Sequence, residues 1–319
     1  MPVNSDKPER WKADIVESVS LYNKWFLEFA PKAYRDTRVD TAKEVESAFK
    51  RTANLTDITP AVLKQYPSVL PMLRMATAPP IARDRLVGLA GVSRGLVYTM
   101  EDERRIPPRM DTMSVDTELR KIGQVIIKLA DRDIVPWLDR SDYKPNDEEI
   151  RRAATIIADR LCGTTADPII RNAQEQRQFS TMGHWLEDRG YSEADDRPDF
   201  DNMRAGTFAY RINVPVSLEG TSARIRIPID VVIMPLRSQP GDLPVMIEAK
   251  SAGDFTNVNK RRKEEAKKIT QLRSELGEKL RYVLFLCGYF DTGYLGYEAA
   301  EGIDWIWEHS IDDFAELGI

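Results

Sequence analysis

The 319-residue chain has little of what marks several protein classes. It contains two cysteines, Cys162 and Cys287, and two histidines. Two cysteines so far apart in sequence exclude a disulfide scaffold, and this supply of sulfur and imidazole leaves little for a zinc site. Any bound metal is therefore expected to be held by oxygen atoms.

The chain also lacks an apolar leader and any long hydrophobic run. Its first residues, M-P-V-N-S-D-K-P-E-R-W-K, contain no apolar core of a signal peptide. No stretch approaches the roughly 18 apolar residues that a membrane-spanning helix needs. We expect a cytoplasmic protein with no membrane partner.

An excess of positive charge is missing as well. The formal net charge is -5, which argues against a uniformly cationic nucleic-acid binder. The charges are segregated, however: residues 260–281 hold nine Lys or Arg and four Glu, whereas residues 291–319 hold eight Asp or Glu and no Lys or Arg. A cationic segment is thus followed by an anionic tail.

The first 160 residues are typical of helices separated by proline-bearing turns such as T-P-A-V-L-K-Q-Y-P and R-I-P-P-R. Asn146 and Glu149 have the spacing of a capping box that starts one helix. A second helix is predicted to begin at Asp167 and Pro168 and to end near Gly190. We therefore expect a helical N-terminal region over residues 1–145.

After Gly190 the pattern changes to strands. The segments T-F-A-Y-R-I-N-V, A-R-I-R-I-P-I-D-V-V-I-M, V-M-I-E-A-K and Y-V-L-F-L-C-G-Y are strand-like, and a basic helix lies between the last two. Residues 146–319 are predicted to form an α/β or α+β core, a mixed sheet flanked by helices.

Two of these strands carry charges in unusual places. Asp230 interrupts an apolar strand, and its neighbours at alternate positions are expected to face the other way: Ile225, Ile227, Ile229, Val231 and Ile233. In V-M-I-E-A-K, Glu248 and Lys250 share a face because strand side chains have period two. If the two strands pair with Asp230 beside Glu248, both carboxylates and the ammonium group converge.

Such a cluster suits phosphodiester hydrolysis. Two adjacent carboxylates repel each other unless a divalent cation lies between them, and a site of carboxylates, carbonyls and water suits Mg2+. A neighbouring lysine can position a water and stabilise the charge that develops on a phosphate. Asp230, Glu248 and Ala249 are the expected metal ligands, and Lys250 is expected to orient the water.

Glu175 is a fourth candidate. Glu175, Phe179, Met182 and Leu186 lie at i, i+4, i+7 and i+11, so the carboxylate is aligned with an apolar stripe. A charge there is costly unless something pairs with it.

The arrangement Ile229-Asp230 followed by Glu248-Ala249-Lys250 resembles the P-D…(D/E)-x-K signature of the restriction-endonuclease-like nuclease fold. In an arbitrary soluble protein this pattern is more often a solvated strand end. The apolar hairpin, Glu175 on the preceding helix and the cationic helix that follows favour the nuclease. Many nucleases of this fold carry a supporting carboxylate where Glu175 lies. The first motif departs from the family pattern, since Pro228 lies one place early.

The resemblance extends beyond the motif. Segments such as D-P-I-I-R-N-A-Q-E-Q-R-Q, E-A-K-S-A-G-D-F-T-N-V-N-K-R-R-K-E-E-A and L-F-L-C-G-Y-F-D-T-G-Y-L-G-Y-E-A-A-E-G-I-D-W resemble type II restriction enzymes of the XamI family. The likeness spans roughly residues 70–310. It implies Mg2+-dependent cleavage of double-stranded DNA at a short palindrome, GTCGAC or a relative of it, in a restriction-modification system.

Two regions are candidates for DNA contact. One follows the E-A-K motif: Ser251, Asn257, Asn259, Lys260, Arg261, Arg262, Lys263 and Lys267, with Lys268 beside them as a further candidate for phosphate contact. The alternatives are a tight turn and a solvated helix face paired with Glu264 and Glu265. The other region has the pattern of a helix-turn-helix, with a turn at Gly91, Ser93 as N-cap and Arg94 and Tyr98 exposed. The same pattern also joins ordinary core helices.

The sequence therefore predicts a site-specific endonuclease without an organic cofactor. Because a palindrome has two-fold symmetry, the enzyme is expected to act as a homodimer. The helical region would supply recognition or dimer contacts. Two alternatives stay open: a non-specific or structure-specific nuclease of the same fold in repair or mobile-element processing, and a non-catalytic DNA-binding protein.

Overall fold

The computed structural model describes residues 2–140, 144–194, 198–217, 224–256, 258–277 and 279–319, and for residues 201 and 258–264 it describes the main chain only. The chain divides into two compact units, one of residues 1–29 with 171–319 and one of residues 30–170. The boundary expected after residue 145 falls inside the second unit. Across the described ranges, no helix is long and apolar enough to span a lipid bilayer.

Two helices of 41 residues contribute to both units: α1, Trp11–Arg51, and α7, Asp147–Glu187. The prediction of two helices meeting at Pro168 is wrong, because α7 continues through that residue. An interior proline costs about 3 kcal/mol, but ending the helix there would leave several amides and carbonyls without partners. The capping box at the start of α7 is confirmed, with Asn146 and Glu149 each accepting the amide of the other at 3.0 and 2.9 Å.

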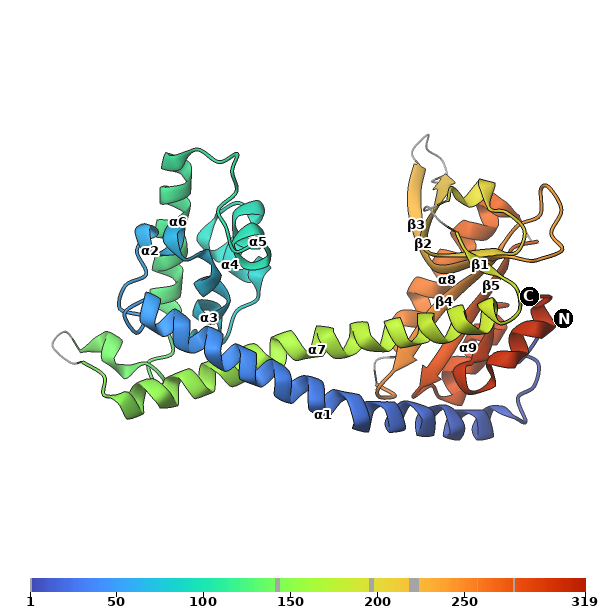
Figure 1. The fold of residues 1–319 in the computed structure, drawn as a ribbon, viewed down its shortest axis with the longest axis horizontal. Helices are drawn as coiled ribbons and strands as arrows, with labels where there is room; N and C mark the ends of the chain where they lie inside the picture. The colour runs from blue at the N-terminus through green and yellow to red at the C-terminus, as the bar shows by residue number, and fades with distance from the viewer. Residues whose placement is uncertain (1, 141–143, 195–197, 218–223, 257, 278) are drawn as a thin grey trace. The chain divides into compact units, whose positions relative to one another are not determined.

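The unit of residues 30–170 is helical, as predicted, and the chain enters it on α1 and leaves it on α7 (Figure 1). Between these lie α2 (Pro60–Gln65), η1 (Pro67–Val69), α3 (Leu70–Met75), α4 (Arg83–Ala90), α5 (Arg94–Asp102), α6 (Thr112–Leu129) and η2 (Pro136–Asp139). Its core is apolar, but one ion pair is buried: Arg74 meets Glu101 at 2.6 Å.

The helix-turn-helix is present within this unit. Helix α4 ends at Gly91, which has φ 58° and so needs the left-handed conformation that glycine adopts freely. Helix α5 then begins after Ser93, whose hydroxyl accepts the Leu96 amide at 3.1 Å.

The other unit contains a six-stranded mixed sheet in the order β1-β2-β3-β4-β5-β6. The strands are β1 (Ser192–Glu193), β2 (Thr207–Ser217), β3 (Arg224–Met234), β4 (Val245–Ala252), β5 (Arg281–Gly288) and β6 (Asp304–Trp307). β2, β3 and β4 are antiparallel neighbours, whereas β1 with β2, and β4 with β5 and β6, are parallel. The predicted mixed α/β class is confirmed, and β1 and β6 are strands that the sequence pattern did not predict.

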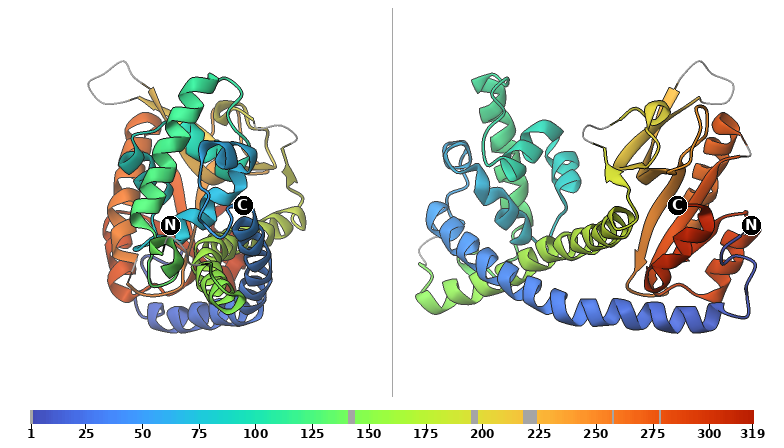
Figure 2. Two further views of the ribbon diagram at one scale, coloured as in Figure 1. Left: turned by 90° about the vertical axis from the view of Figure 1, so that its left-hand side faces the viewer. Right: turned by 45° about the vertical axis from the view of Figure 1, so that its right-hand side comes forward.

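Helices cover both faces of the sheet (Figures 1 and 2). The residues of α7 that were expected to form an apolar stripe, Phe179, Met182 and Leu186, are buried on one face together with Phe314 of η4 (Glu308–Leu317). The other face packs against α8 (Val258–Leu276) and α9 (Thr292–Ala300). Trp11 at the start of α1 packs edge-on against Trp305 on this second face.

The hairpin of β2 and β3 changes face halfway along. Ile227 and Ile229 lie on the α8 face, whereas Val231 and Ile233 lie on the α7 face, so the expected single alternation over residues 225–233 is wrong. The change occurs at Asp230, opposite Arg211, whose φ of 54° is rare for a residue with a side chain. This irregularity rotates the part of the hairpin formed by residues 212–217 and 224–229 relative to the rest.

Two glycines of the helical unit provide a test of its packing. A methyl group on Gly123 of α6 would lie 2.6 Å from the main-chain oxygen of Ile58, whereas one on Gly163 of α7 would meet nothing within 4 Å. Gly123→Ala should lower the free energy of unfolding by about 1–3 kcal/mol. Gly163→Ala should raise it by about 0.5–1 kcal/mol. Urea denaturation measures both, and equal shifts would contradict the packing described.

Candidate functional site

The candidate site lies where β3 parts from β4. The two strands pair at only three positions, the last being Val231 with Ile247. Beyond them β3 stays with β2, while β4 continues beside β5. Pro228 fits this outer part of β3, because a residue without an amide hydrogen is tolerated where a strand has a partner on one side only.

Asp230 lies at this fork. Its Oδ2 accepts the Ala249 amide at 2.9 Å, so the side chain takes up a main-chain donor that the departing strand no longer satisfies. Burial raises the pKa of Asp230 to about 6, and the nearby negative charge of Glu248 adds to the effect. In the register set by the pairing of Val231 with Ile247, Asp230 and Glu248 are the next opposed positions, so the two carboxylates meet at the fork.

Glu248 and Lys250 share a face of β4, as predicted, and they touch. The Lys250 Nζ is 3.0 Å from Glu248 Oε1. Both side chains are largely buried, on the face covered by α8. The opposite charges and charge-assisted hydrogen bonding keep Lys250 cationic, and its pKa is raised even though burial acts in the other direction.

Two residues of α8 complete the cluster. Lys268 makes an ion pair with Oε2 of Glu248, and Glu265 lies 3.2 Å from the Lys250 Nζ. Glu265 is only 2% exposed and accepts a hydrogen bond from the Tyr294 hydroxyl of α9 at 2.8 Å. The cluster therefore contains three carboxylates and two ammonium groups.

The sequence pattern did not indicate Glu265 as a member of the site, and it indicated Lys268 only as a phosphate contact. Glu265 was treated as part of a solvated helix face. A signal was available, because Glu265, Ile269, Leu272 and Leu276 lie at i, i+4, i+7 and i+11. This is the same alignment with an apolar stripe that singled out Glu175.

A cavity of about 510 Å³ opens beside the cluster. One wall is the outer part of β3, and the remaining walls come from β4 and α8. The lining residues are Ile225, Arg226, Ile227, Pro228, Glu248, Lys250, Glu265, Lys267, Lys268 and Gln271. Anionic and cationic groups thus face one solvent-accessible space.

Glu175 is placed differently from the other three candidates. It forms an ion pair with Arg211 at 2.9 Å, and its side chain is 36% exposed. Arg211 lies on β2 between Tyr210 and Ile212, and these two residues pair with Val231 and Ile229 of β3. Glu175 therefore contacts the strand next to the one that carries Asp230.

Among the residues whose side chains are described, no group of three or more His, Cys, Asp or Glu is placed to hold a metal ion.

The predicted DNA-contact residues near the motif are only partly described. Ser251 lies on β4, and Lys267 is exposed on α8 at the rim of the cavity. Asn257 lies outside the described residues. The main chain of α8 includes Asn259, Lys260, Arg261, Arg262 and Lys263, whose side chains lie outside the description.

Arg94 and Tyr98 are on the outer face of α5. Arg94 is 69% exposed, and its guanidinium donates to the Tyr98 hydroxyl at 3.1 Å and pairs with Asp84 of α4 at 3.5 Å. The Tyr98 hydroxyl in turn donates to Asp84 at 3.1 Å. Arg94 is therefore accessible, Tyr98 is partly exposed, and polar contacts hold both side chains to α4.

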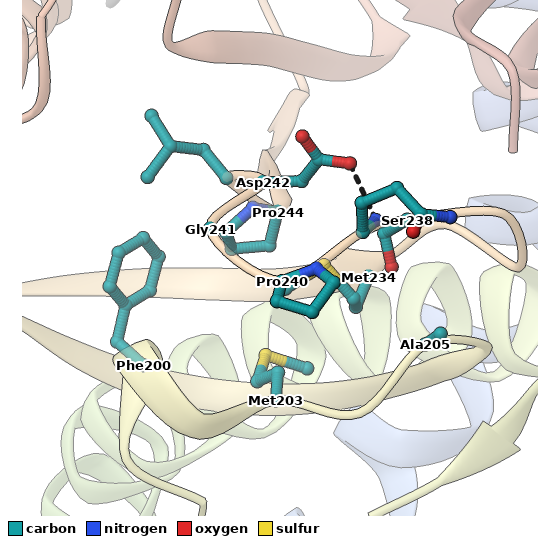
Figure 3. A pocket seen from close by; sticks show the side chains of 11 residues that line it. Phe200, Met203, Ala205, Met234, Ser238, Pro240, Gly241, Asp242 and Pro244 are labelled. Atoms are coloured by element: carbon teal, nitrogen blue, oxygen red, sulfur yellow. Dashed lines mark hydrogen bonds between the residues drawn. The ribbon is translucent and has the colours of Figure 1, made fainter.

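A second pocket, of about 480 Å³, lies beneath the connection between β3 and β4 (Figure 3). Phe200, Met203, Met234 and two prolines dominate its lining. The one titratable side chain among its lining residues is Asp242, whose carboxylate accepts the Gln239 amide at 2.7 Å. This pocket offers no cluster of the kind found at the fork.

A mixed sheet that presents two carboxylates and a lysine where neighbouring strands diverge is the arrangement that the resemblance to restriction-endonuclease-like nucleases implies. A profile of the XamI restriction endonuclease family matches residues 53–307. The chain belongs to the XamI restriction endonuclease family. The resemblance stated from the sequence is thereby confirmed, together with the prediction of a restriction endonuclease.

One relative matches over nearly the whole length. The chain is 54% identical over 319 residues to the type II restriction enzyme SalI of Streptomyces albus G, and the match covers 99% of each protein. Among solved structures, protein VC1899 from Vibrio cholerae shows 16% identity and a TM-score of 0.29. That match covers 80% of this chain and 55% of the other, so this chain spans about half of that protein's length.

The raised pKa of Asp230, caused by burial and by the charge of Glu248, predicts a stability change in metal-free protein. A carboxyl group whose pKa is raised by folding favours the folded state when it is protonated. For Asp230, this contribution to the free energy of unfolding is complete below the ordinary aspartate pKa of 3.8 and is lost as the pH rises through about 6. At pH 8, with a chelator present, Asp230→Asn should therefore raise the free energy of unfolding by about 1–3 kcal/mol, a gain that disappears below pH ~4.

The control is Asp111→Asn. Asp111 is the exposed N-cap of α6, and its pKa is lowered by hydrogen bonding with Ser114. This substitution should give no gain at pH 8. A loss of stability in Asp230→Asn at pH 8 would show that the ionised carboxylate is well accommodated without a cation.

Proposed function

We propose that this chain is a Mg2+-dependent type II restriction endonuclease that cuts both strands of duplex DNA at a short palindrome. The observation that carries the proposal is the convergence of Asp230, Glu248 and Lys250 at the fork between β3 and β4. The recognition site proposed is GTCGAC or a relative of it, and the near full-length likeness to SalI supports it.

The donor set fits a hard divalent cation. Asp230 and Glu248 offer carboxylate oxygens, Ala249 adds a main-chain carbonyl, and no cysteine or histidine has a described side chain in the cluster. A cation between the two carboxylates would also offset the burial and the repulsion by Glu248 that together raise the pKa of Asp230. When bound, Mg2+ supplies Lewis acidity and a water of lowered pKa.

The protein's own groups have distinct roles in this proposal. Asp230 and Glu248 hold the cation and thereby set where the scissile phosphate lies. Lys250 donates hydrogen bonds to the attacking water or to a phosphate oxygen, and as a cation it stabilises the negative charge that develops there. Glu175 supports the site from α7 by fixing Arg211 opposite Asp230.

DNA contacts are assigned to two regions. Ser251, Asn257, Asn259, the basic residues 260–263 and Lys267 follow the motif and would lie along the phosphate backbone. Arg94 and Tyr98 would reach DNA from the helix-turn-helix, so that the helical region supplies recognition. A two-fold homodimer is the simplest assembly for cutting a palindrome.

Cleavage of a plasmid of known sequence tests the activity. In Mg2+ we expect discrete fragments whose ends map to one palindromic site. Asp230→Ala and Lys250→Ala should each slow cleavage about 100-fold or more, because each removes a group that stabilises the transition state. Lys7→Ala removes a lysine paired with Glu316 in the same unit and should cut at the wild-type rate.

Each alternative has its own outcome in this experiment. A smear or nicked circles would indicate a non-specific or structure-specific nuclease. Salt-dependent binding without any cleavage would indicate a binding protein. Activity that survives in Asp230→Ala and Lys250→Ala would show that the catalytic assignment is wrong.

The role of Arg94 is tested by the salt dependence of binding. Arg94→Ala should weaken binding to cognate duplex in Ca2+ and reduce the slope of log K against log[salt] by about 1. Arg38 provides a matched control, because it too is exposed, lies over a tyrosine ring and pairs with an aspartate, Asp159, at 2.9 Å. If Arg38→Ala and Arg94→Ala have equal effects, α5 has no special role.

A further inference from the structure

Both carboxylate oxygens of Glu248 are occupied by lysines. Lys250 lies 3.0 Å from Oε1, and Lys268 pairs with Oε2. These contacts are partly buried, which strengthens the attraction relative to the same pair in water. A divalent cation that takes Glu248 as a ligand must therefore compete with an ammonium group at whichever oxygen it binds.

The two lysines differ in what else they can bind. Lys250 has a second carboxylate in reach, because Glu265 lies at 3.2 Å. Glu265 is itself fixed by the Tyr294 hydroxyl at 2.8 Å and is 2% exposed. Lys250 can therefore release Glu248 and remain paired. Lys268 contacts no second acidic side chain among the residues whose side chains are described.

The cavity offers Lys268 another place to bind. Lys268 lines this space together with Lys267 and Gln271 of α8, and Arg226 lies on the β3 side. These side chains are cationic or neutral hydrogen-bond donors, which suit a phosphate oxygen. A released Lys268 would thus remain beside the position that the scissile phosphate must occupy.

We propose that Lys268 is a placeholder cation on Glu248, which the divalent ion displaces and which then contacts the DNA phosphate, while Glu265 holds Lys250 in place during the exchange. This inference rests on the proposed metal site at Asp230 and Glu248. Lys268 is a further DNA-contact residue for the reaction, and Glu265 is a positioning residue that acts through Lys250.

The charges of the cluster are consistent with this exchange. When all five groups are ionised, the three carboxylates and two ammonium groups carry one net negative charge. A divalent cation reverses the sign and leaves one positive charge, which a bound phosphodiester neutralises. When no metal is bound, the two lysines thus neutralise most of the carboxylate charge. When metal and phosphodiester are both bound, the same two lysines leave the cluster without a net charge.

Binding of Mn2+ to the full-length protein without DNA tests the exchange, with free Mn2+ measured by electron paramagnetic resonance. Lys268→Met removes the competing ammonium group and should tighten Mn2+ binding about tenfold. Glu265→Gln deprives Lys250 of its second partner, so that Lys250 holds Glu248 more firmly and Mn2+ binds more weakly. Tyr294→Phe frees Glu265 without a change of charge and should act in the same direction as Glu265→Gln.

Lys267→Met is the matched control. It removes the same charge from the neighbouring residue in the same cavity, without a contact to Glu248. Its effect on Mn2+ binding should be much smaller than that of Lys268→Met. In cleavage of cognate DNA, Lys268→Met should have a lower kcat than the wild type although it binds the metal more tightly. General damage to the fold would weaken metal binding in every variant.

The outcomes separate this inference from the proposed function. If Asp230→Asn binds Mn2+ as the wild type does, the metal site is wrong and the inference fails with it. If Asp230→Asn loses binding but Lys268→Met gains nothing over the wild type, only the placeholder role is overturned. The same holds if Lys267→Met matches Lys268→Met, or if Lys268→Met cuts DNA at the wild-type rate.

Discussion

Asp230 accepts the Ala249 amide at the point where β3 leaves β4, and the rest of the site is arranged around this bond. A strand that departs from its neighbour leaves main-chain donors without partners, and a carboxylate there is both a cap for the strand and a candidate ligand. The divergence also opens the space that becomes the cavity. The divergence of β3 from β4 thus supplies a candidate ligand, fixes its orientation and gives a substrate access to it.

The fork has an energetic cost that the surrounding structure offsets. The hairpin changes face at Asp230, and Arg211 opposite adopts a positive φ that costs of the order of 1–3 kcal/mol. Burying several charges adds to this. The apolar residues on both faces of the sheet and the ion pairs within the cluster hold the arrangement in place. Strain and buried charge of this kind concentrate at functional sites.

Much of this could be read from the sequence. Apolar runs identified four of the strands, and the period of two placed Glu248 and Lys250 on the same face. Gly91 and Ser93 identified the helix-turn-helix, because left-handed backbone and N-cap geometry depend on single residues. These predictions are correct because each depends only on residues that are neighbours in the sequence.

The remaining features depend on contacts between distant segments. Glu265 is buried because Lys250 of β4 and Tyr294 of α9 converge on it, and neither partner is near it in sequence. Pro168 did not end a helix, because the packing of both halves outweighs one missing hydrogen bond. Glu175 had the expected alignment, but its partner is Arg211, a residue whose conformation local propensity does not predict.

The division of the chain has a consequence for the order of synthesis. Residues 30–170 form one continuous segment, so this unit can complete its contacts while the ribosome is still at work. The unit with the sheet cannot, since it joins the first residues of the chain to the last: the main chain of Asn4 and Ser5 donates to Asp304, and Trp11 packs on Trp305. The N-terminal segment must wait for β6 to emerge. The unit that carries the fork is therefore the later of the two to close, after β6 has been made.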